Sequence, residues 1–327
     1  MTEPVSYTKN DGGTVSPVPF RIVASWPARA FAENVAIGPD GSVFVTVYSN
    51  SSIERYDPAS GDTSLFAKLP VPPMGLAFDE AGTLWVTGGT MRTAPGYIWK
   101  IDAEGVVQYW TDLADATFVN GCTVHPNGRD LLVCESRSSR ILAIDMTKAG
   151  KWSTWLEDDW IGPGESPYPG ANGIKIRDGW AWVTVSGRML IVRVPILADG
   201  SPGSVELAFP EVLGDDFTFG ASGALYVTTH PAQTVICASI HRAPGRRSRD
   251  RPKGSWAQRP ARSERRPATS MRSMSRQTVA SSFRTRMSCR MPSSFGSKSA
   301  KPAGLSWVTA EPRPYPMRQQ LSCRIGP

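Results

Sequence analysis

Short alternating apolar segments, separated by glycine-containing turns, recur from residue 33 to about residue 240. Each unit has a small or polar pair, a short apolar strand, a turn and a second apolar strand. Five such units align, and they begin at Glu33, Met74, Asn120, Asn172 and Asp215. Their turns are PDG, EAG, PNG, RDG and ASG, and a glycine at such a turn supplies the positive φ that a tight hairpin needs. The pattern therefore predicts five β-hairpins of one repeated design.

The spacing of the units favours a β-propeller. Their starts are 41, 46, 52 and 43 residues apart, close to the length of one four-stranded blade. Four units continue into a further strand: SIERYD, YIWKID, RILAID and LIVRVP. We predict an all-β fold, a six-bladed β-propeller with five recognisable blades, over residues 20–240. Five units in register disfavour the alternative, an ordinary β-sandwich with coincidental turns.

Two finer expectations follow from this alignment. Trp85, Trp182 and Tyr226 should lie on equivalent strands of their blades, because each stands at the same place in its unit. Six-bladed rings commonly close by pairing an N-terminal strand with the last blade. The segment FRIVASW from Phe20 is the candidate for that closing strand.

The composition changes sharply near residue 240. Residues 241–327 contain 20 Lys and Arg against three acidic residues, a balance of +17, so the remaining 16 and 26 give residues 1–240 a balance of −10. The same segment has 15 serines but only five Ile, Leu or Val residues. Such a composition buries too little apolar surface to offset chain entropy. We predict a flexible N-terminal segment over 1–19, a propeller over 20–240, and a basic tail of low order over 241–327.

The basic tail has two interpretations. A nucleic-acid-binding arm would carry RGG-type repeats or interleaved aromatic residues, which the tail lacks, so no nucleic-acid partner is expected. A frameshift explains the tail better, because the codons of residues 268–280, read one frame away, can encode a segment containing ALYVATNGG. That segment parallels ALYVTTHP of the fifth unit. We therefore interpret the tail as a frameshift product and predict that the chain lacks its sixth blade.

The sequence gives no sign of a membrane or of secretion. No run approaches 18 apolar residues, and the first residues do not place an apolar stretch after a basic one. The five cysteines are scattered and form no recognisable pair. The expectation is a cytoplasmic protein without a membrane partner, whose oligomeric state stays open.

The first residues of the units carry the candidate chemistry. In a propeller the innermost strands line a central channel, and each unit begins where such a strand opens at one end of it. Four of the five first residues offer side-chain oxygens: Glu33, Asn120, Asn172 and Asp215. Carboxylate and amide oxygens suit hard cations such as Ca²⁺, Mg²⁺ or Mn²⁺. The alternative is that these residues only stabilise turns and caps.

The units resemble the senescence marker protein (regucalcin)/gluconolactonase family of six-bladed propellers. The resemblance covers about residues 20–240 and is carried by FAENVAIGPDG, VNGCTVHPNG, ANGIKI and DDFTF. It implies one divalent metal ion (Ca, Zn, Mn or Mg) held by Glu33, Asn172 and Asp215, with Asn120 contacting the substrate. Asp216 replaces Asp215 as a metal ligand if the strand register slips by one. The chain departs from the family in having Glu-Asn-Val where Glu-Gly-Pro is usual, and Asp-Asp-Phe where Asp-Gly is usual.

The activity that the resemblance implies is metal-dependent hydrolysis of a lactone or a related small ester. The metal would act as a Lewis acid, Asp215 would be the general base, and Asn120 would orient the substrate. No GxSxG elbow is present, which agrees with a mechanism without a serine nucleophile. His125, in the PNG turn, is expected to be exposed, and His230 to lie in a loop. A non-catalytic propeller binding a small ligand or protein, and a strictosidine-synthase-like propeller, stay open as alternatives.

Overall fold

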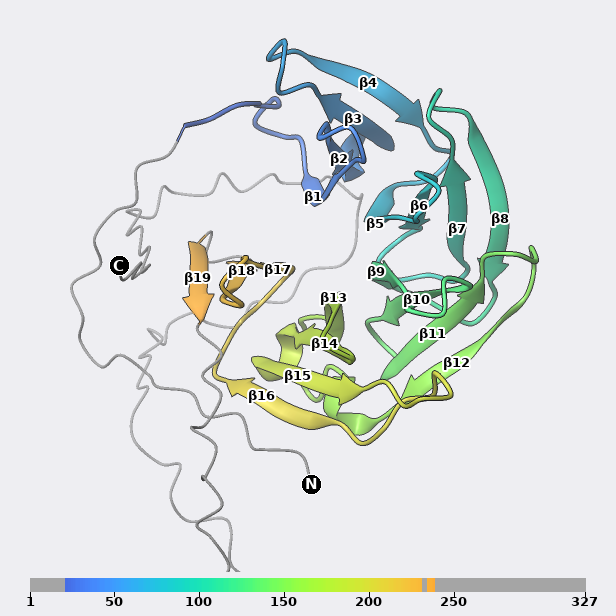
Figure 1. The fold of residues 1–327 in the computed structure, drawn as a ribbon, viewed down its shortest axis with the longest axis vertical. Coiled ribbons are helices and arrows are strands. Elements are labelled where there is room, and N and C mark those ends of the chain that lie inside the picture. The colour runs from blue at the N-terminus through green and yellow to red at the C-terminus, as the bar shows by residue number, and fades with distance from the viewer. Residues whose placement is uncertain (1–20, 231–233, 239–327) are drawn as a thin grey trace, which may run out of the picture. The chain divides into compact units, whose positions relative to one another are not determined.

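A computed structural model describes residues 21–230 and 234–238 of the chain (Figure 1). These residues form nineteen β-strands and three short 3₁₀ helices, and the strands make five antiparallel sheets that follow one another around a common axis. The all-β prediction and the five predicted propeller blades are thus confirmed. The predictions for residues 1–19 and 241–327 lie outside the described residues. No helix in the described part is long and apolar enough to cross a membrane.

The first three blades each contain four strands that pair in sequence order, the first being innermost. Blade 1 comprises β1 (Ala32–Ile37), β2 (Val43–Val47), β3 (Ser52–Tyr56) and β4 (Thr63–Lys68). Blade 2 comprises β5 (Pro73–Phe78), β6 (Leu84–Gly88), β7 (Gly96–Ile101) and β8 (Val107–Leu113). Blade 3 comprises β9 (Val119–Val124), β10 (Asp130–Glu135), β11 (Arg140–Asp145) and β12 (Trp152–Glu157).

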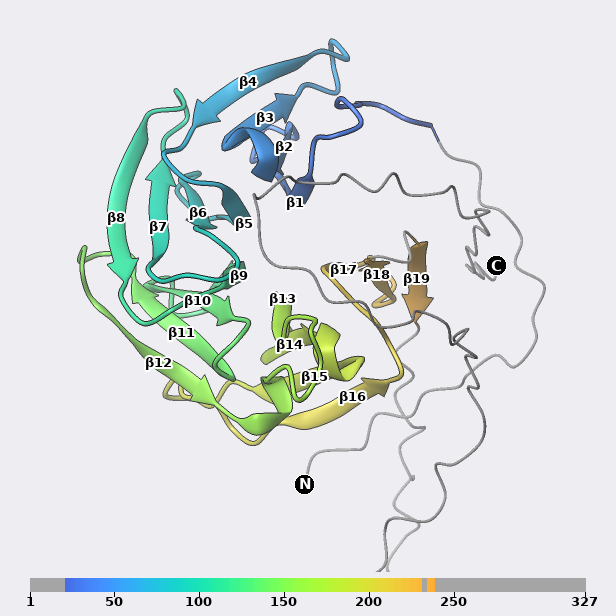
Figure 2. The same ribbon diagram turned by 180° about the vertical axis from the view of Figure 1, so that it is seen from behind.

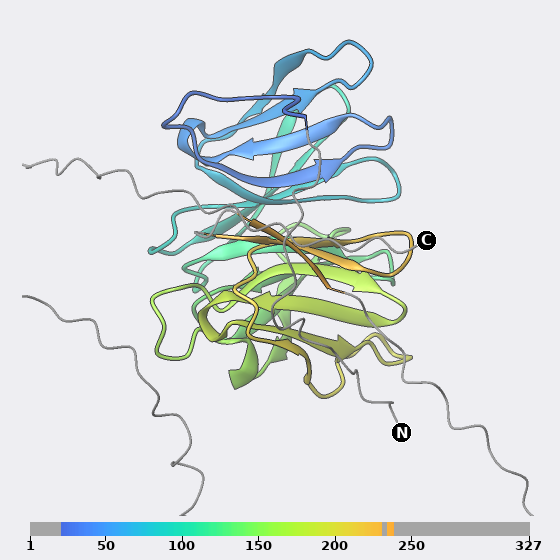
Figure 3. The same cartoon turned by 90° about the vertical axis from the view of Figure 1, so that its left-hand side faces the viewer.

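The fourth blade repeats this plan, and the fifth shows three strands in its described part. Blade 4 comprises β13 (Ala171–Arg177), β14 (Trp180–Val185), β15 (Leu190–Pro195) and β16 (Glu206–Pro210). Blade 5 comprises β17 (Phe217–Phe219), β18 (Leu225–Thr229) and β19 (Thr234–Ala238). The 3₁₀ helices are η1 (Tyr48–Asn50), η2 (Asp159–Ile161) and η3 (Ser186–Arg188). Figure 2 shows the blades from behind, and Figure 3 shows them from the side.

The alignment of the units predicted the strand register correctly in the second strands. Trp85, Trp182 and Tyr226 lie on β6, β14 and β18, at equivalent positions of those strands. The expectation of a closing strand from Phe20 is wrong for residues 21–26, which form no strand. The side chains of Ile22 and Val23 are largely exposed, so this segment finds no described sheet on which to pack.

The hydrophobic core is divided among the interfaces between successive blades. Residues on one face of each sheet pack against the facing residues of the next sheet, as the period-two alternation of a strand requires. Between blades 1 and 2, for example, Phe44 and Ile53 of blade 1 lie in one buried cluster with Leu76 and Val86 of blade 2. Three further clusters join blades 2 and 3, blades 3 and 4, and blades 4 and 5. Each interface thus has its own small core.

A repeated hydroxyl, which we call the threonine latch, also joins successive blades. Thr46, Thr87 and Thr184 occupy one position on the second strand of blades 1, 2 and 4. Each hydroxyl donates to the carbonyl of the first residue of the next unit, at oxygen–oxygen distances of 3.0, 2.6 and 2.6 Å respectively. Because each hydroxyl also accepts a backbone N–H of its own inner strand, the latch fixes both inner strands at the channel.

Candidate functional site

A β-bulge at the start of each inner strand places the candidate residues. In blade 4 the pairing of β13 with β14 skips from Ala171 to Ile174, so Asn172 and Gly173 lie opposite the single residue Thr184. The inner strands of blades 1, 2 and 3 skip in the same way. The first bulged residue is in every case the first residue of the sequence unit. Bulges turn side chains away from the regular pleat, which explains why chemistry-bearing residues stand at this point.

Hydrogen bonds from the inner strand to the threonine of the second strand fix the register of blade 5. The N–H of Asp216 donates to the hydroxyl of Thr228 at 3.2 Å, as the N–H of Gly173 does to Thr184 at 2.9 Å. Asp215 is therefore the equivalent of Asn172, and Asp216 is the equivalent of Gly173. A Cβ atom on Gly173 would collide with Asp216, so the glycine makes room for this second aspartate.

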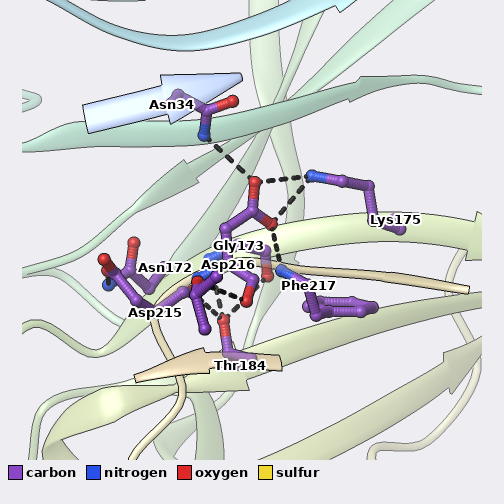
Figure 4. Close-up of polar contacts among 9 residues, drawn as sticks. Asn34, Asn172, Gly173, Lys175, Thr184, Asp215, Asp216 and Phe217 are labelled. Atoms are coloured by element: carbon purple, nitrogen blue, oxygen red, sulfur yellow. Dashed lines mark hydrogen bonds and ion pairs between the residues drawn. The ribbon is translucent and has the colours of Figure 1, made fainter. Parts of the chain in front are cut away.

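Asn172 and Asp215 are in direct contact (Figure 4). The Nδ2 atom of Asn172 donates to Oδ1 of Asp215 at 2.6 Å and to the Ser186 hydroxyl at 3.0 Å. Ser186 in turn donates to the carbonyl of Gly214 at 2.6 Å. Because both donor positions of the Asn172 amide are used in this way, its carbonyl oxygen Oδ1 is left as the group available to a ligand.

Asn120 is held by the same device one blade earlier. Its Nδ2 atom donates to the Ser136 hydroxyl at 3.3 Å, and that hydroxyl donates to the carbonyl of Ala171 at 2.7 Å. The side chain is buried. The serine that follows the second strand therefore orients the asparagine in both blades.

Glu33 shares its surroundings with the two aspartates. Burial, together with the charges of Asp215 and Asp216, raises the pKa of Glu33 to about 8. Tyr48, in η1, lies close enough to Glu33 for burial and that carboxylate to raise the pKa of its phenol. Glu33 of blade 1 and Asp215 of blade 5 thus lie within electrostatic reach of each other.

The pKa of Asp215 is also raised, for mixed reasons. Burial is the largest cause, and the charge of Asp216 adds to it, whereas the hydrogen bond from Asn172 and the nearby His230 act in the opposite direction. His230 lies in a turn after β18, outside the strands as expected; it is exposed, and its ring centroid lies 5.9 Å from that of Phe31. Burial and the nearness of other carboxyl groups therefore oppose the charged forms of both Glu33 and Asp215.

Asp216 has different surroundings from Asp215. Both of its carboxylate oxygens lie 2.8 Å from Nζ of Lys175, Oδ1 accepts the N–H of Phe217 at 2.8 Å, and Oδ2 accepts Nδ2 of Asn34 at 3.1 Å (Figure 4). The Asn34 bond joins blade 1 directly to blade 5. Asp216 is thus neutralised and held on both oxygens.

Lys175 and Asn34 were not among the candidates from the sequence. Lys175 occupies a strand position that holds Ala36, Ala77, Thr123 and Thr218 in the other blades. A single charged residue at a position that is otherwise small is a signal that comparison of the units can detect. Asn34 gives no such signal, because its role depends on a contact with a residue 182 positions away.

One further observation limits the chemistry of the site. Within the described residues, no three His, Cys, Asp or Glu side chains are grouped so that they could hold a metal ion, so the three acidic residues do not form a carboxylate cage.

The expectation that His125 is exposed is wrong. Its side chain is buried because Nε2 donates to the carbonyl of Gly200 at 3.1 Å, Nδ1 accepts the N–H of Asn127 at 3.2 Å, and Trp155 packs on its ring.

Comparison with known proteins gives similarity in structure alone. No family model matches the chain, and no curated protein matches it. A chain of a nidogen–laminin complex aligns with a TM-score of 0.52 and 17% sequence identity, covering 64% of this chain and 76% of that one. This likeness shows the fold. The chain is a β-propeller.

Other similar structures include enzymes and a calcium-binding protein. Virginiamycin B lyase from Staphylococcus aureus is 21% identical, with a TM-score of 0.48 over 64% of this chain and 67% of that one. Regucalcin from Agrobacterium tumefaciens, described as a calcium-binding protein, is 19% identical, with a TM-score of 0.48 over 62% of this chain and 70% of that one. A shared fold does not fix function, so function has to be argued from the site itself.

Proposed function

We propose that the chain has the site of a metal-dependent hydrolase that acts on a lactone or a related small ester. The observation that carries the proposal is the burial of Glu33 beside the carboxyl groups of Asp215 and Asp216. A glutamate whose pKa is raised to about 8 by burial and by the charges of two neighbouring aspartates is stabilised in its charged form by a bound cation. The residues present therefore fit a divalent metal ion.

The proposed ligands are Glu33, Asn172 and Asp215, one from each of blades 1, 4 and 5. Asn172 offers its Oδ1 atom because its Nδ2 atom is already bonded. Asp216 is not a ligand in this proposal, since Lys175 and Asn34 occupy its oxygens. When bound, the ion would act as a Lewis acid on the carbonyl of the ester.

The remaining steps belong to side chains of the protein. Asp215 accepts a proton from the attacking water, and its raised pKa brings it closer to the value that suits a general base. Asn120, fixed by Ser136, orients the ring oxygens of the substrate. The ion pair between Lys175 and Asp216 fixes the backbone at Asp216 and thereby holds the preceding residue, Asp215, in position.

The test is a hydrolysis screen of lactones and small esters with the full chain, with and without added Ca²⁺, Mn²⁺, Mg²⁺ or Zn²⁺. Asp215→Asn is expected to lower turnover by a factor of about 10² or more, because it removes the base. Asp199→Asn, in an exposed turn far along blade 4, is the matched control and should leave turnover unchanged. Calorimetric titration with the same ions should lose its signal in Glu33→Gln. Equal turnover in the two aspartate variants would contradict the proposal, as would the absence of ion binding.

A further inference from the structure

Blade 1 has an apolar sheet face that no described blade covers. Cross-strand pairing places Val35 beside Val45 and Ile37 beside Val43 on this face. The first row continues through the half-buried Glu54 to Leu65. Val35, Ile37 and Leu65 are 56%, 62% and 55% exposed. We call this surface the open face of blade 1.

The corresponding face of the next blade shows what normally covers such residues. Leu76 and Val86 of blade 2 occupy the positions of Val35 and Val45, yet they are only 4% and 0% exposed. They are buried because blade 1 packs against them. The open face of blade 1 therefore has the pattern of a surface made to receive a preceding blade.

Blade 5 has the complementary face. Val235 pairs with Thr228, just as Ile53, Ile98 and Ile191 pair with the three latch threonines. Those three isoleucines are fully buried, whereas Val235 is 38% exposed. We call Thr228 and Val235 the open face of blade 5.

The latch position of blade 5 identifies the kind of partner that is missing. Thr46, Thr87 and Thr184 reach the next blade, but the hydroxyl of Thr228 donates to the carbonyl of Asp216 in its own blade at 2.9 Å. In blades 1, 2 and 4 this hydroxyl meets the carbonyl of the first residue of the next unit. Glu33 is the first residue of the first unit, so the threonine hydroxyl of a blade preceding blade 1 would bond to the carbonyl of Glu33. Both positions match the contacts that one blade makes with the next elsewhere in this chain.

We infer that the open faces of blades 1 and 5 form a docking surface for one further β-blade, which a separate polypeptide can supply. The occupant we assign is the blade encoded one frame away after about codon 240. That frame can encode ALYVATNGG, which parallels ALYVTTHP at the second strand of blade 5. The chain's own residues 241–327 are excluded by composition, because five Ile, Leu or Val residues among 87 cannot cover two apolar faces.

The experiment uses the full 327-residue chain and, as the probe, the polypeptide translated in the shifted frame from codon 241 to its stop codon. The two are mixed, and binding is followed by fluorescence anisotropy of the labelled probe, with stoichiometry from analytical ultracentrifugation. The expected result is a one-to-one complex and a raised midpoint of thermal unfolding. Val235→Asp and Val35→Asp should each weaken binding by about tenfold or more, since each buries an unpaired charge in the complex. Thr228→Val, which removes only the latch hydroxyl, should weaken it by about fivefold.

Val106→Asp is the matched control. Val106 is 61% exposed beside the β7–β8 turn, outside both open faces, so its substitution should leave binding unchanged. All four positions are exposed in the free chain, so the variants should fold like the parent, which circular dichroism will verify. The inference is overturned if the probe does not bind, or if Val235→Asp and Val106→Asp bind it equally. It is also overturned if the chain instead forms a dimer with a second copy of itself that Val235→Asp disrupts.

Discussion

Blades 2, 3 and 4 have neighbours on both sides, whereas blades 1 and 5 each have a described neighbour on one side only. The strands of the two groups carry the same alternation of apolar residues, but their burial differs. Ile191 of blade 4 is fully buried, and its equivalent Val235 of blade 5 is 38% exposed. The alternating apolar pattern of a strand therefore indicates which sheet face can pack against another blade. Whether that face is buried depends on the presence of the neighbouring blade.

The largest expected effect comes from giving blades 1 and 5 a neighbour on both sides, as blades 2, 3 and 4 have. Restoring the reading frame near codon 240 should complete the ring and bury Val35, Ile37 and Val235. Full burial of such a side chain contributes about 1.5–3 kcal/mol, so the free energy of unfolding should rise by several times that amount. Urea denaturation of the two forms measures the change. An equal midpoint and slope in both forms would show that the added residues form no blade.

The next largest effect compares equivalent residues inside and outside a closed interface. Ile191→Ala should lower the free energy of unfolding by about 2–5 kcal/mol, because it leaves a cavity between blades 4 and 5. Val35→Ala, on the open face of blade 1, should change it by less than about 0.5 kcal/mol. Both values come from chemical denaturation of the 327-residue chain. If Val35→Ala costs as much as Ile191→Ala, the open face is already covered and the comparison fails.

The threonine latches allow the same comparison at a smaller scale. Thr87→Val removes a buried hydroxyl that bonds the carbonyl of Asn120 and the N–H of Gly75, so it should cost about 1–3 kcal/mol. Thr228→Val removes a hydroxyl that bonds only within its own exposed strand pair and should cost less than about 1 kcal/mol. Thermal unfolding of the two variants gives the ranking. The reverse ranking would mean that the latches do not join the blades.

The last expected effect is a dependence of stability on pH, and it arises where blades 1 and 5 meet. The folded chain keeps Glu33 protonated up to about pH 8, whereas the unfolded chain loses that proton near the ordinary value of 4.5. The folded state thus binds more protons between these values, so the stability of the metal-free chain should fall as the pH rises from about 4.5 to 8. Glu33→Gln should flatten this part of the profile, measured in the presence of a chelator. A profile unchanged by the substitution would show that the pKa of Glu33 is not raised in the folded chain.

The repeated pattern made most of the fold predictable from the sequence. Turn glycines and period-two alternation located five blades, and the alignment put Asn172 and Asp215 at equivalent positions, where the structure joins them by a hydrogen bond. The bulge that aims these side chains was not predictable from residue types, because it is a property of strand pairing. The burial of His125 was missed for a related reason, since the carbonyl that binds it belongs to Gly200, 75 residues away.

The site was predictable where one unit could be compared with another, and unpredictable where the contact crosses the ring. The assignment of Asp215 rather than Asp216 to the position of Asn172 needed the bonds to Thr228 and Thr184. The ion pair of Asp216 with Lys175 depends on two blades being adjacent. Long-range contacts of this kind become visible only after the sheets are arranged in space.

The threonine latches point in one direction along the chain, always from a blade to the one that follows it. During synthesis on the ribosome, blades 1, 2 and 4 would each emerge with a hydroxyl donor ready for a carbonyl that has not yet been translated. Such a donor can turn back into its own strand pair, as Thr228 does, so it keeps an acceptor until the next blade arrives. Assembly can then pause after a blade that carries this threonine and resume, and a gene that gains or loses one such repeat unit would need no new chemistry at the joint.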